Sequence, residues 1–148
     1  EENGFLSNWY KSKFEVAGRA FSSIEQFMMY QKAICFGDEA VAEQILKTDD
    51  VARIKELGRM VSGYNENIWN GMRQLIVYEG LVAKFSQNVE LKEKLLQTGN
   101  ALLAECAVHD RIWGIGLSMK DEKRFDISQW RGESLLGYAL MMVRNKIK

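Results

Sequence analysis

An acid and an amine stand seven positions apart, at Glu25 and Lys32, in a stretch whose pattern is typical of a helix. Seven residues at about 100° each fall roughly 20° short of two turns, so both side chains leave one face of that helix. Met28 and Met29 lie between them, which places the pair in an apolar surface. The two groups are suited to flank a small substrate. The alternative is that Glu25 completes a capping box and Lys32 reaches solvent.

A second candidate pair, Trp69 and Arg73, shares one face of a helix because the two residues are four apart. An indole ring beside a guanidinium group is suited to bind a heterocyclic base and a phosphate. The alternative is a core tryptophan next to an arginine that makes a surface ion pair. The residue pattern leaves both interpretations open.

The segment His109–Leu117 combines polar, aromatic and glycine residues in a predicted loop. Gly114 and Gly116 allow the backbone to approach a ligand closely, and loops frequently carry functional residues. A dinucleotide-binding fingerprint is excluded, because Met119 occupies the position that needs a third glycine. Asp110, a polar residue of this predicted loop, is therefore a candidate functional residue.

Composition and charge exclude several classes of protein. The 20 Lys and Arg residues balance the 20 Asp and Glu residues, which argues against a protein that mainly coats nucleic acid. The single histidine, His109, excludes a zinc site built on two or three imidazoles, and we expect neither a metal nor another cofactor. No apolar run approaches the roughly 18 residues of a membrane span, and no signal peptide is visible. Cys35 and Cys106 are then expected to be reduced, buried thiols of a cytoplasmic protein.

The elements that must position these residues are expected to be mainly helical. Capping residues and apolar periodicity predict helices over 22–36, 48–58, 65–85, 89–97 and 134–147, and one that begins at Asp38. Residues 10–22 alternate as a hairpin with a turn at 17–19, and 101–107 are predicted to form a strand. The fold class is therefore α+β, mainly helical, in one domain over 1–148 with a small antiparallel element.

The residue pattern also predicts one buried helix face and the residues at two helix ends. The longest helix is expected to bury the apolar residues Ile68, Met72, Leu75, Ile76 and 78–82. Gly58 is predicted to end the helix before it, because glycine readily adopts the left-handed backbone that follows a last turn. Ser134 is predicted to cap the final helix.

An ordered set of short motifs runs along nearly the entire chain: Phe5-Leu6-Ser7-Asn8, Phe21-x-Ser23-x-Glu25-Gln26, Leu57-Gly58-Arg59, Lys84-Phe85-x-Gln87-Asn88, Leu96-x-Thr98-Gly99 and Asp110-x-x-Trp113-Gly114-x-Gly116-Leu117. This set resembles the NADAR family, also known through its YbiA-like members. The resemblance implies a mainly helical α+β fold and an N-glycosidase that acts on ribosylated nitrogen. One departure is Ser134, which stands where the family usually has asparagine.

The resemblance also implies a class of substrate. YbiA-like members are associated with hydrolysis of reactive ribosylamino-pyrimidine phosphate intermediates of riboflavin biosynthesis, which pre-empts metabolite damage. Other members remove ADP-ribose from modified guanine bases, and a non-catalytic module that binds ADP-ribose or a nucleotide is a further alternative. The expected partner is a small ribosylated base or an ADP-ribose-like ligand, with no membrane. Nucleic acid is a partner only if ADP-ribosylated guanine is the substrate.

Candidate roles follow from the resemblance and from the chemistry of C1′–N cleavage. The leaving nitrogen needs a proton and the positive charge at C1′ needs stabilisation, for which Glu25 and Asp110 are the candidates. The alternative is that Lys32 attacks C1′ of a ring-opened imine and forms a Schiff base. The candidate substrate-binding residues, which include aromatic rings to stack on the base and arginines to hold the phosphate, are Asn8, Arg59, Trp69, Arg73, Glu105 and Trp113.

Overall fold

Residues 2–148, which the computed structural model describes, fold into six α-helices, one two-stranded sheet and three short 3-10 helices. The α-helices are α1 (Ile24–Cys35), α2 (Glu39–Leu46), α3 (Val51–Arg59), α4 (Glu66–Gln87), α5 (Val89–Gln97) and α6 (Leu135–Lys146). The strands are β1 (Phe14–Val16) and β2 (Arg19–Phe21), and the 3-10 helices are η1 (Gly4–Leu6), η2 (Glu122–Phe125) and η3 (Ile127–Gln129). The predicted fold class is confirmed.

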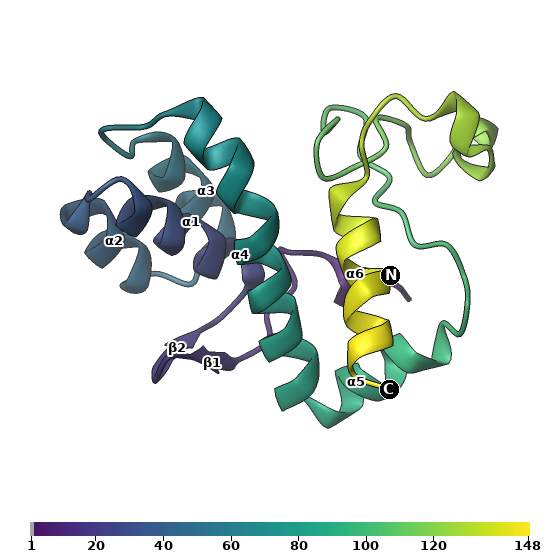
Figure 1. Cartoon of the computed structure of the whole chain (residues 1–148), viewed down its shortest axis with the longest axis horizontal. Helices are drawn as coiled ribbons and strands as arrows, with labels where there is room; N and C mark the ends of the chain where they lie inside the picture. The colour runs from purple at the N-terminus through teal and green to yellow at the C-terminus, as the bar shows by residue number, and fades with distance from the viewer. Residues whose placement is uncertain (1) are drawn as a thin grey trace.

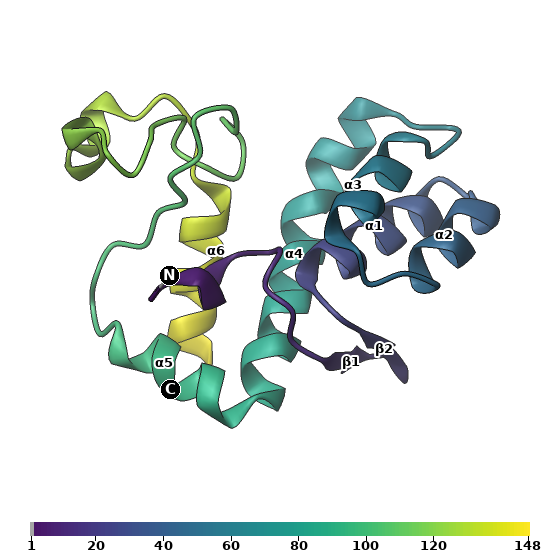
Figure 2. The ribbon, with the colours of Figure 1, turned by 180° about the vertical axis from the view of Figure 1, so that it is seen from behind.

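The long helix α4 lies between two groups of elements (Figures 1 and 2). α1 packs against α2, α3 and α4 on one side, whereas α5 and α6 pack against α4 on the other. The N-terminal segment begins beside α6 and crosses to the hairpin (Figure 2). Side chains such as Phe27, Leu81 and Val143 are fully buried and join the groups into one core.

The hairpin forms because two adjacent residues adopt a left-handed backbone. Ala17 and Gly18 have φ angles of 52° and 78°, as in the two-residue turns whose twist matches antiparallel strands. Phe14 pairs with Phe21, and both rings are buried. Arg19 is the first residue of β2 and does not belong to the turn, which the sequence predicts over 17–19.

The start of α1 decides the role of Glu25. The Ser23 hydroxyl oxygen accepts a hydrogen bond from the Gln26 backbone N–H at 3.1 Å, so Ser23 is the N-cap residue. The Gln26 side chain reaches back and accepts from the Ser22 backbone N–H at 2.7 Å. Gln26, and not Glu25, completes the cap, so the interpretation of Glu25 as a capping residue is wrong.

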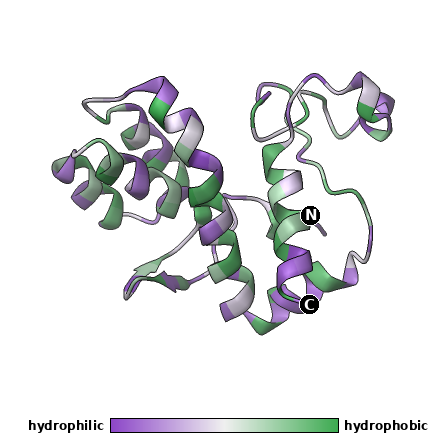
Figure 3. Cartoon of the chain, viewed as in Figure 1, coloured by the Kyte–Doolittle hydropathy of each residue, from purple (hydrophilic) through white to green (hydrophobic). Residues whose placement is uncertain are grey.

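The predicted buried face of α4 is wrong in part. Ile68, Met72 and Leu75 are 50%, 40% and 65% exposed. The buried residues are instead Trp69, Ile76, Val77, Gly80, Leu81, Lys84 and Phe85. Hydrophobic and hydrophilic residues are intermixed along the helix (Figure 3), so its apolar residues alone do not define one face. Close packing does define it, because a Cβ atom at Gly80 would lie 2.7 Å from Cδ2 of Phe27.

The prediction for Gly58 is wrong, and the prediction for Ser134 is correct in position but not in hydrogen bonding. α3 continues through Gly58 and ends at Arg59, and a Cβ atom at Gly58 would overlap Sδ of Met29. Gly58 therefore permits contact between α3 and α1, and it does not end the helix. Ser134 is the N-cap residue of α6 with φ of 52°, but its hydroxyl group makes no capping hydrogen bond and is buried without a partner among residues 2–148.

Two further expectations are corrected. Residues 101–107 do not form a strand, and their backbone runs as an irregular segment in which the Glu105 carbonyl accepts a hydrogen bond from the Ile115 N–H at 2.8 Å. Cys35 is exposed and Cys106 is partly buried, so the two free thiols are not both core residues. Within residues 2–148, no helix has the length and apolar character that a membrane span requires.

Candidate active site

Seven of the nine predicted site residues meet at one cavity of about 290 Å³: Asn8, Glu25, Lys32, Arg59, Glu105, Asp110 and Trp113. α1 contributes the acid and the amine on one face, as their spacing predicted. α3 contributes Arg59, and the segment before α1 contributes Asn8. The remaining wall comes from the long loop between α5 and α6, which carries Glu105, Asp110 and Trp113.

Glu25 lies in the first turn of α1 and is only 5% exposed. Burial is the main cause that raises its pKa from an ordinary 4.5 to about 7. The charge of Lys55 opposes this rise most strongly and that of Lys32 least. No hydrogen bond from the described residues contributes to the shift. A carboxyl group with a pKa near neutrality can hold a proton and donate it, as a general acid must.

Two further carboxyl groups face Glu25 from the long loop. Their negative charges add to the rise of the Glu25 pKa, with Glu105 contributing more than Asp110. Burial raises the pKa of Glu105 as well, and Asp110 adds to that rise. One oxygen of Asp110, Oδ1, accepts hydrogen bonds from the backbone N–H groups of Ile112 and Trp113 at 3.0 and 2.9 Å. Three acidic side chains therefore line one cavity, and Asp110 also stabilises the conformation of the loop that carries it.

Lys32 stands between the cavity and two aromatic rings. Its Nζ atom is 4.7 Å from the ring centre of Tyr64 and 5.9 Å from that of Trp69. Burial lowers the pKa of Lys32, Glu25 opposes that decrease and Arg59 adds to it. Aromatic rings at this distance favour the charged ammonium form. The amine thus experiences opposing influences, and its reactivity depends on their balance.

Trp69 and Arg73 do not line the cavity. Trp69 is 6% exposed and belongs to the hydrophobic core, as the alternative interpretation of that pair held. Arg73 is partly buried, and its Nε atom has no hydrogen-bond partner among the described residues. Neither side chain is placed to form an exposed platform for a base.

Sequence reasoning missed Lys55, which also lines the cavity. It precedes Arg59 by four residues on α3, so both cations leave the same face of that helix. Its Nζ atom lies 5.7 Å from the ring centre of Trp9, another residue of the cavity wall. The spacing of Lys55 and Arg59 was the available signal. Within residues 2–148, no group of three or more His, Cys, Asp or Glu side chains is arranged to hold a metal ion.

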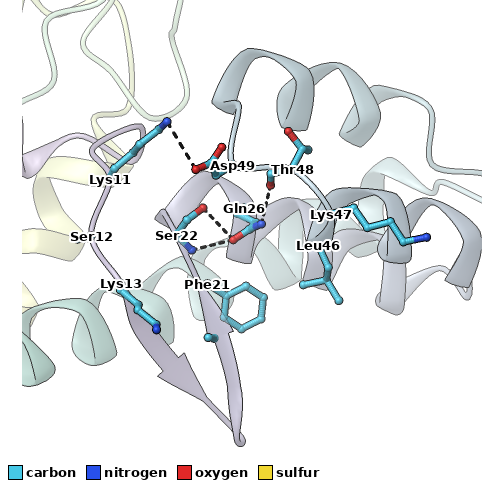
Figure 4. Close-up of a pocket in the computed structure, with 11 residues that line it drawn as sticks. Lys11, Ser12, Lys13, Phe21, Ser22, Gln26, Leu46, Lys47, Thr48 and Asp49 are labelled. Carbon is cyan, nitrogen blue, oxygen red and sulfur yellow. Dashed lines mark hydrogen bonds and ion pairs between the residues drawn. The ribbon is translucent and has the colours of Figure 1, made fainter.

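A larger hollow of about 670 Å³ lies between the hairpin and the end of α2 (Figure 4). Several of its polar groups are engaged with one another, whereas the buried hydroxyl group of Ser12 has no partner among the described residues. The side chain of Gln26 bonds to the Ser22 backbone and hydroxyl groups at 2.7 and 3.0 Å, and donates to the carbonyls of Ile45 and Thr48 at 3.1 and 2.8 Å. Lys11 approaches Asp49 at 3.9 Å. This larger hollow has one carboxylate in its lining, the exposed Asp49, whereas Glu25, Glu105 and Asp110 line the smaller cavity.

The fold and the cavity agree with a family that the sequence matches throughout. The model of the NADAR domain matches residues 1–148, and the chain belongs to the NADAR family. It is 39% identical over 146 residues to N-glycosidase R617 of Acanthamoeba polyphaga mimivirus, with 95% of this chain and 86% of that protein covered. The resemblance found in the motifs is confirmed.

Two further relatives bear on fold and function. The chain is similar to the NMR structure of the Escherichia coli protein YbiA, with a TM-score of 0.81, 28% identity, and 99% of this chain and 79% of that chain covered. It is 30% identical to the riboflavin biosynthesis protein VVA0006 of Vibrio vulnificus over 148 residues, which span 36% of that protein. The relatives named N-glycosidases are hydrolases of N-glycosyl bonds, the enzyme class that the sequence predicted.

Proposed function

We propose that this protein is an N-glycosidase that hydrolyses the ribosyl C1′–N bond of reactive ribosylamino-pyrimidine phosphates of riboflavin biosynthesis. The observation that carries the proposal is Glu25, a buried carboxyl group whose pKa is raised to about 7 beside the further acids Glu105 and Asp110. The similarity to N-glycosidase R617 and to a riboflavin biosynthesis protein supports the reaction and the substrate class.

In the proposed reaction, Glu25 acts as the general acid. Its proton passes to the leaving nitrogen while the C1′–N bond breaks, so the amine departs neutral. The positive charge that develops at C1′ is stabilised by the carboxylate of Asp110, and water adds to C1′. The water proton returns to a carboxylate, which restores the site. The products are the free ribose phosphate and the amino-pyrimidine.

A second route uses Lys32 as a nucleophile. In the ring-opened imine form of the substrate, a neutral Lys32 amine forms a bond to C1′ and the pyrimidine amine leaves. Water then hydrolyses the new imine and releases the ribose phosphate. Burial of Lys32 favours the neutral amine that this route needs, whereas Glu25 and the ring of Tyr64 oppose it.

Borohydride treatment during turnover distinguishes the two routes. A reduced covalent adduct that disappears in Lys32→Ala supports the Schiff base. Full turnover without any adduct assigns the reaction to the acid pair. Mass spectrometry of the intact protein detects the adduct directly.

The size and charge of the cavity favour a small phosphorylated substrate. Its volume of about 290 Å³ lies just below the range of roughly 300–1,000 Å³ that is typical of ligand pockets. Lys55 and Arg59, on one face of α3, are suited to hold a single phosphate monoester. Trp113 and Trp9 are the rings available to stack on the pyrimidine.

A release assay with two substrates in parallel tests the proposal. We expect the protein to release ribose 5-phosphate from ribosylamino-pyrimidine phosphates faster than it releases ADP-ribose from ADP-ribosylated guanine. The opposite preference would assign it to ADP-ribosyl glycohydrolases. Binding of ADP-ribose in calorimetry without release from either substrate would make it a binding module and would overturn the proposal.

A further inference from the structure

A lysine that the proposed reaction does not use is fully buried in α4. Lys84 is 0% exposed, and among residues 2–148 no carboxylate lies within 4.0 Å of its amine. The Nζ atom lies 5.0 Å from the ring centre of Phe85 and 5.4 Å from that of Tyr10. Burial alone lowers the pKa of Lys84 to about 7. An apolar side chain of similar volume would avoid this desolvation, so the amine must serve a specific contact.

That contact is with the N-terminal segment. The Lys84 amine donates hydrogen bonds to the carbonyl oxygens of Phe5 at 2.8 Å and Ser7 at 3.2 Å. The ring of Phe5 meets the ring of Phe85 edge-on at 6.4 Å. α4 therefore contacts both the backbone and a side chain of this segment. Lys84 and Phe5, which share the shorter hydrogen bond, are 79 positions apart in the sequence.

The next residues of the segment form a wall of the active cavity. Asn8 and Trp9 follow Ser7 and line the cavity. The backbone carbonyl of Asn8 accepts a hydrogen bond from the backbone N–H of Glu25 at 3.0 Å. Oδ1 of Asn8 is buried without a partner among the described residues, and a ligand N–H or O–H group would satisfy it. The segment thus links α4 to the first turn of α1.

We infer that Lys84 is a positioning residue, whose amine holds the carbonyls of Phe5 and Ser7 so that Asn8 and Trp9 form one wall of the cavity beside Glu25. Only the kinetic effect of this contact rests on the proposed N-glycosidase reaction. The contact requires N–H donors more than it requires charge, because a neutral amine still has two N–H bonds for the two carbonyls.

Amide hydrogen exchange tests the contact without any substrate. Lys84→Met keeps the volume and removes the donors, so the amides of Leu6, Ser7 and Glu25 should exchange roughly tenfold faster or more, with α2 unchanged. Lys84→Gln keeps two N–H donors and should show a smaller increase. The matched control is Lys94→Met, which removes an exposed amine 5.7 Å from the ring centre of Phe5. It should leave these amides as they are.

Two exchange results would overturn the inference. One is a Lys84→Met protein whose Glu25 amide stays protected as in the wild type. The other is an equal loss of protection in every helix, which would make Lys84 a core residue with no special tie to the site. If Lys84→Met does not fold, the wild-type protein provides the test by NMR. The Nζ protons of Lys84 should then exchange at least about tenfold more slowly than those of Lys94, and equal rates refute the contact.

Kinetics connect the contact to the site. Lys84→Met should raise KM roughly tenfold and change kcat by less than about threefold, because it disturbs Asn8 and Trp9 more than the reacting groups. Altered exchange with unchanged KM would reject the positioning role. If the wild-type protein releases no ribose from any substrate, the proposed function fails while the exchange experiment still decides the fate of the Lys84 contact.

Discussion

Glu25 and Gln26 are adjacent in the chain and equally buried, at 5% exposure each, yet they face different hollows. Gln26 faces the larger one and has hydrogen-bond partners for both ends of its amide. Glu25 faces the smaller one, where burial and neighbouring acids raise its pKa to about 7.

The difference between the two residues separates stability from reactivity. A buried amide with all its partners joins α1 to the end of α2 and stabilises the fold. A buried carboxyl group in a cavity of other acids is destabilised in its charged form and is therefore ready to exchange a proton. The volume of a hollow is a poor indicator of function here, because the larger hollow holds the satisfied residue.

The strongest contrast between the two residues should appear in turnover. Glu25→Gln removes the acidic proton with little change in shape, so kcat should fall by about 100-fold or more. The measurement is ribose 5-phosphate release at saturating substrate, with circular dichroism to confirm the fold. A folded Glu25→Gln protein with nearly wild-type kcat would remove Glu25 from the mechanism.

Gln26→Ala should lower stability and leave turnover nearly unchanged. It leaves the carbonyl of Thr48 and the N–H of Ser22 without their partner and removes one donor from the Ile45 carbonyl, which should lower the free energy of unfolding by about 2–3 kcal/mol. Below the unfolding transition, kcat should stay within about threefold of wild type. Urea denaturation measures the loss. A large decrease in kcat without any loss of stability would reverse the roles that we assign to the two neighbours.

The raised pKa of Glu25 should also appear in the pH dependence of stability and activity. The folded protein binds this proton more tightly than the unfolded chain, so the stability it contributes is present below pH 4.5 and is lost as the pH rises through about 7. Relative to wild type, Glu25→Gln should therefore gain stability over this range, on the order of 3 kcal/mol. In the wild type, kcat/KM should fall above pH 7 as the acid loses its proton.

These two pH effects can be measured separately, by denaturation at several pH values and by a pH–rate profile. If stability shows no difference between wild type and Glu25→Gln at any pH, the carboxyl group does not titrate near 7. If only the decrease in kcat/KM is missing, Glu25 titrates as expected but is not the catalytic acid.

Replacing a lysine of each hollow should change KM by different factors, both smaller than the change in kcat expected for Glu25→Gln. Lys55→Met should raise KM roughly tenfold through loss of a phosphate contact, whereas Lys47→Met, in the larger hollow, should change KM less than twofold. Lys55→Met should also shift the decrease in kcat/KM to higher pH, because the charge of Lys55 lowers the pKa of Glu25. Steady-state kinetics across pH measure both effects, and equal KM values for the two variants would count against a phosphate at α3.

Local chemistry was sufficient to predict most elements. Ser23, Asp38 and Asn65 each accept a backbone hydrogen bond at the start of a helix, as residues of their type do. Residues 89–97 were predicted to be helical and are. The shared face of Glu25 and Lys32 followed from helix geometry, and both line the cavity.

Features that depend on distant contacts were not predictable in this way. Lys84 lies on the buried face of α4, which apolar periodicity cannot indicate because its partners are carbonyls of a segment far away in sequence. Glycine is typical of a helix end, but Gly58 lies within α3, and close contact with Met29 explains why a glycine occupies this position. The spacing of Lys55 and Arg59 places both on one face of α3, but only the fold brings Glu105 and Asp110 to the same cavity.

Gly58 has a consequence for which molecules the cavity admits. It lines the cavity and lies against Met29, so the missing side chain sets the distance between α1, which carries Glu25, and α3, which carries Lys55. Any side chain at this position would overlap the Met29 side chain and displace it from between α1 and α3. The absence of a side chain at residue 58 therefore leaves space for Met29, so that Gly58 and Met29 together form the part of the cavity wall between the two helices.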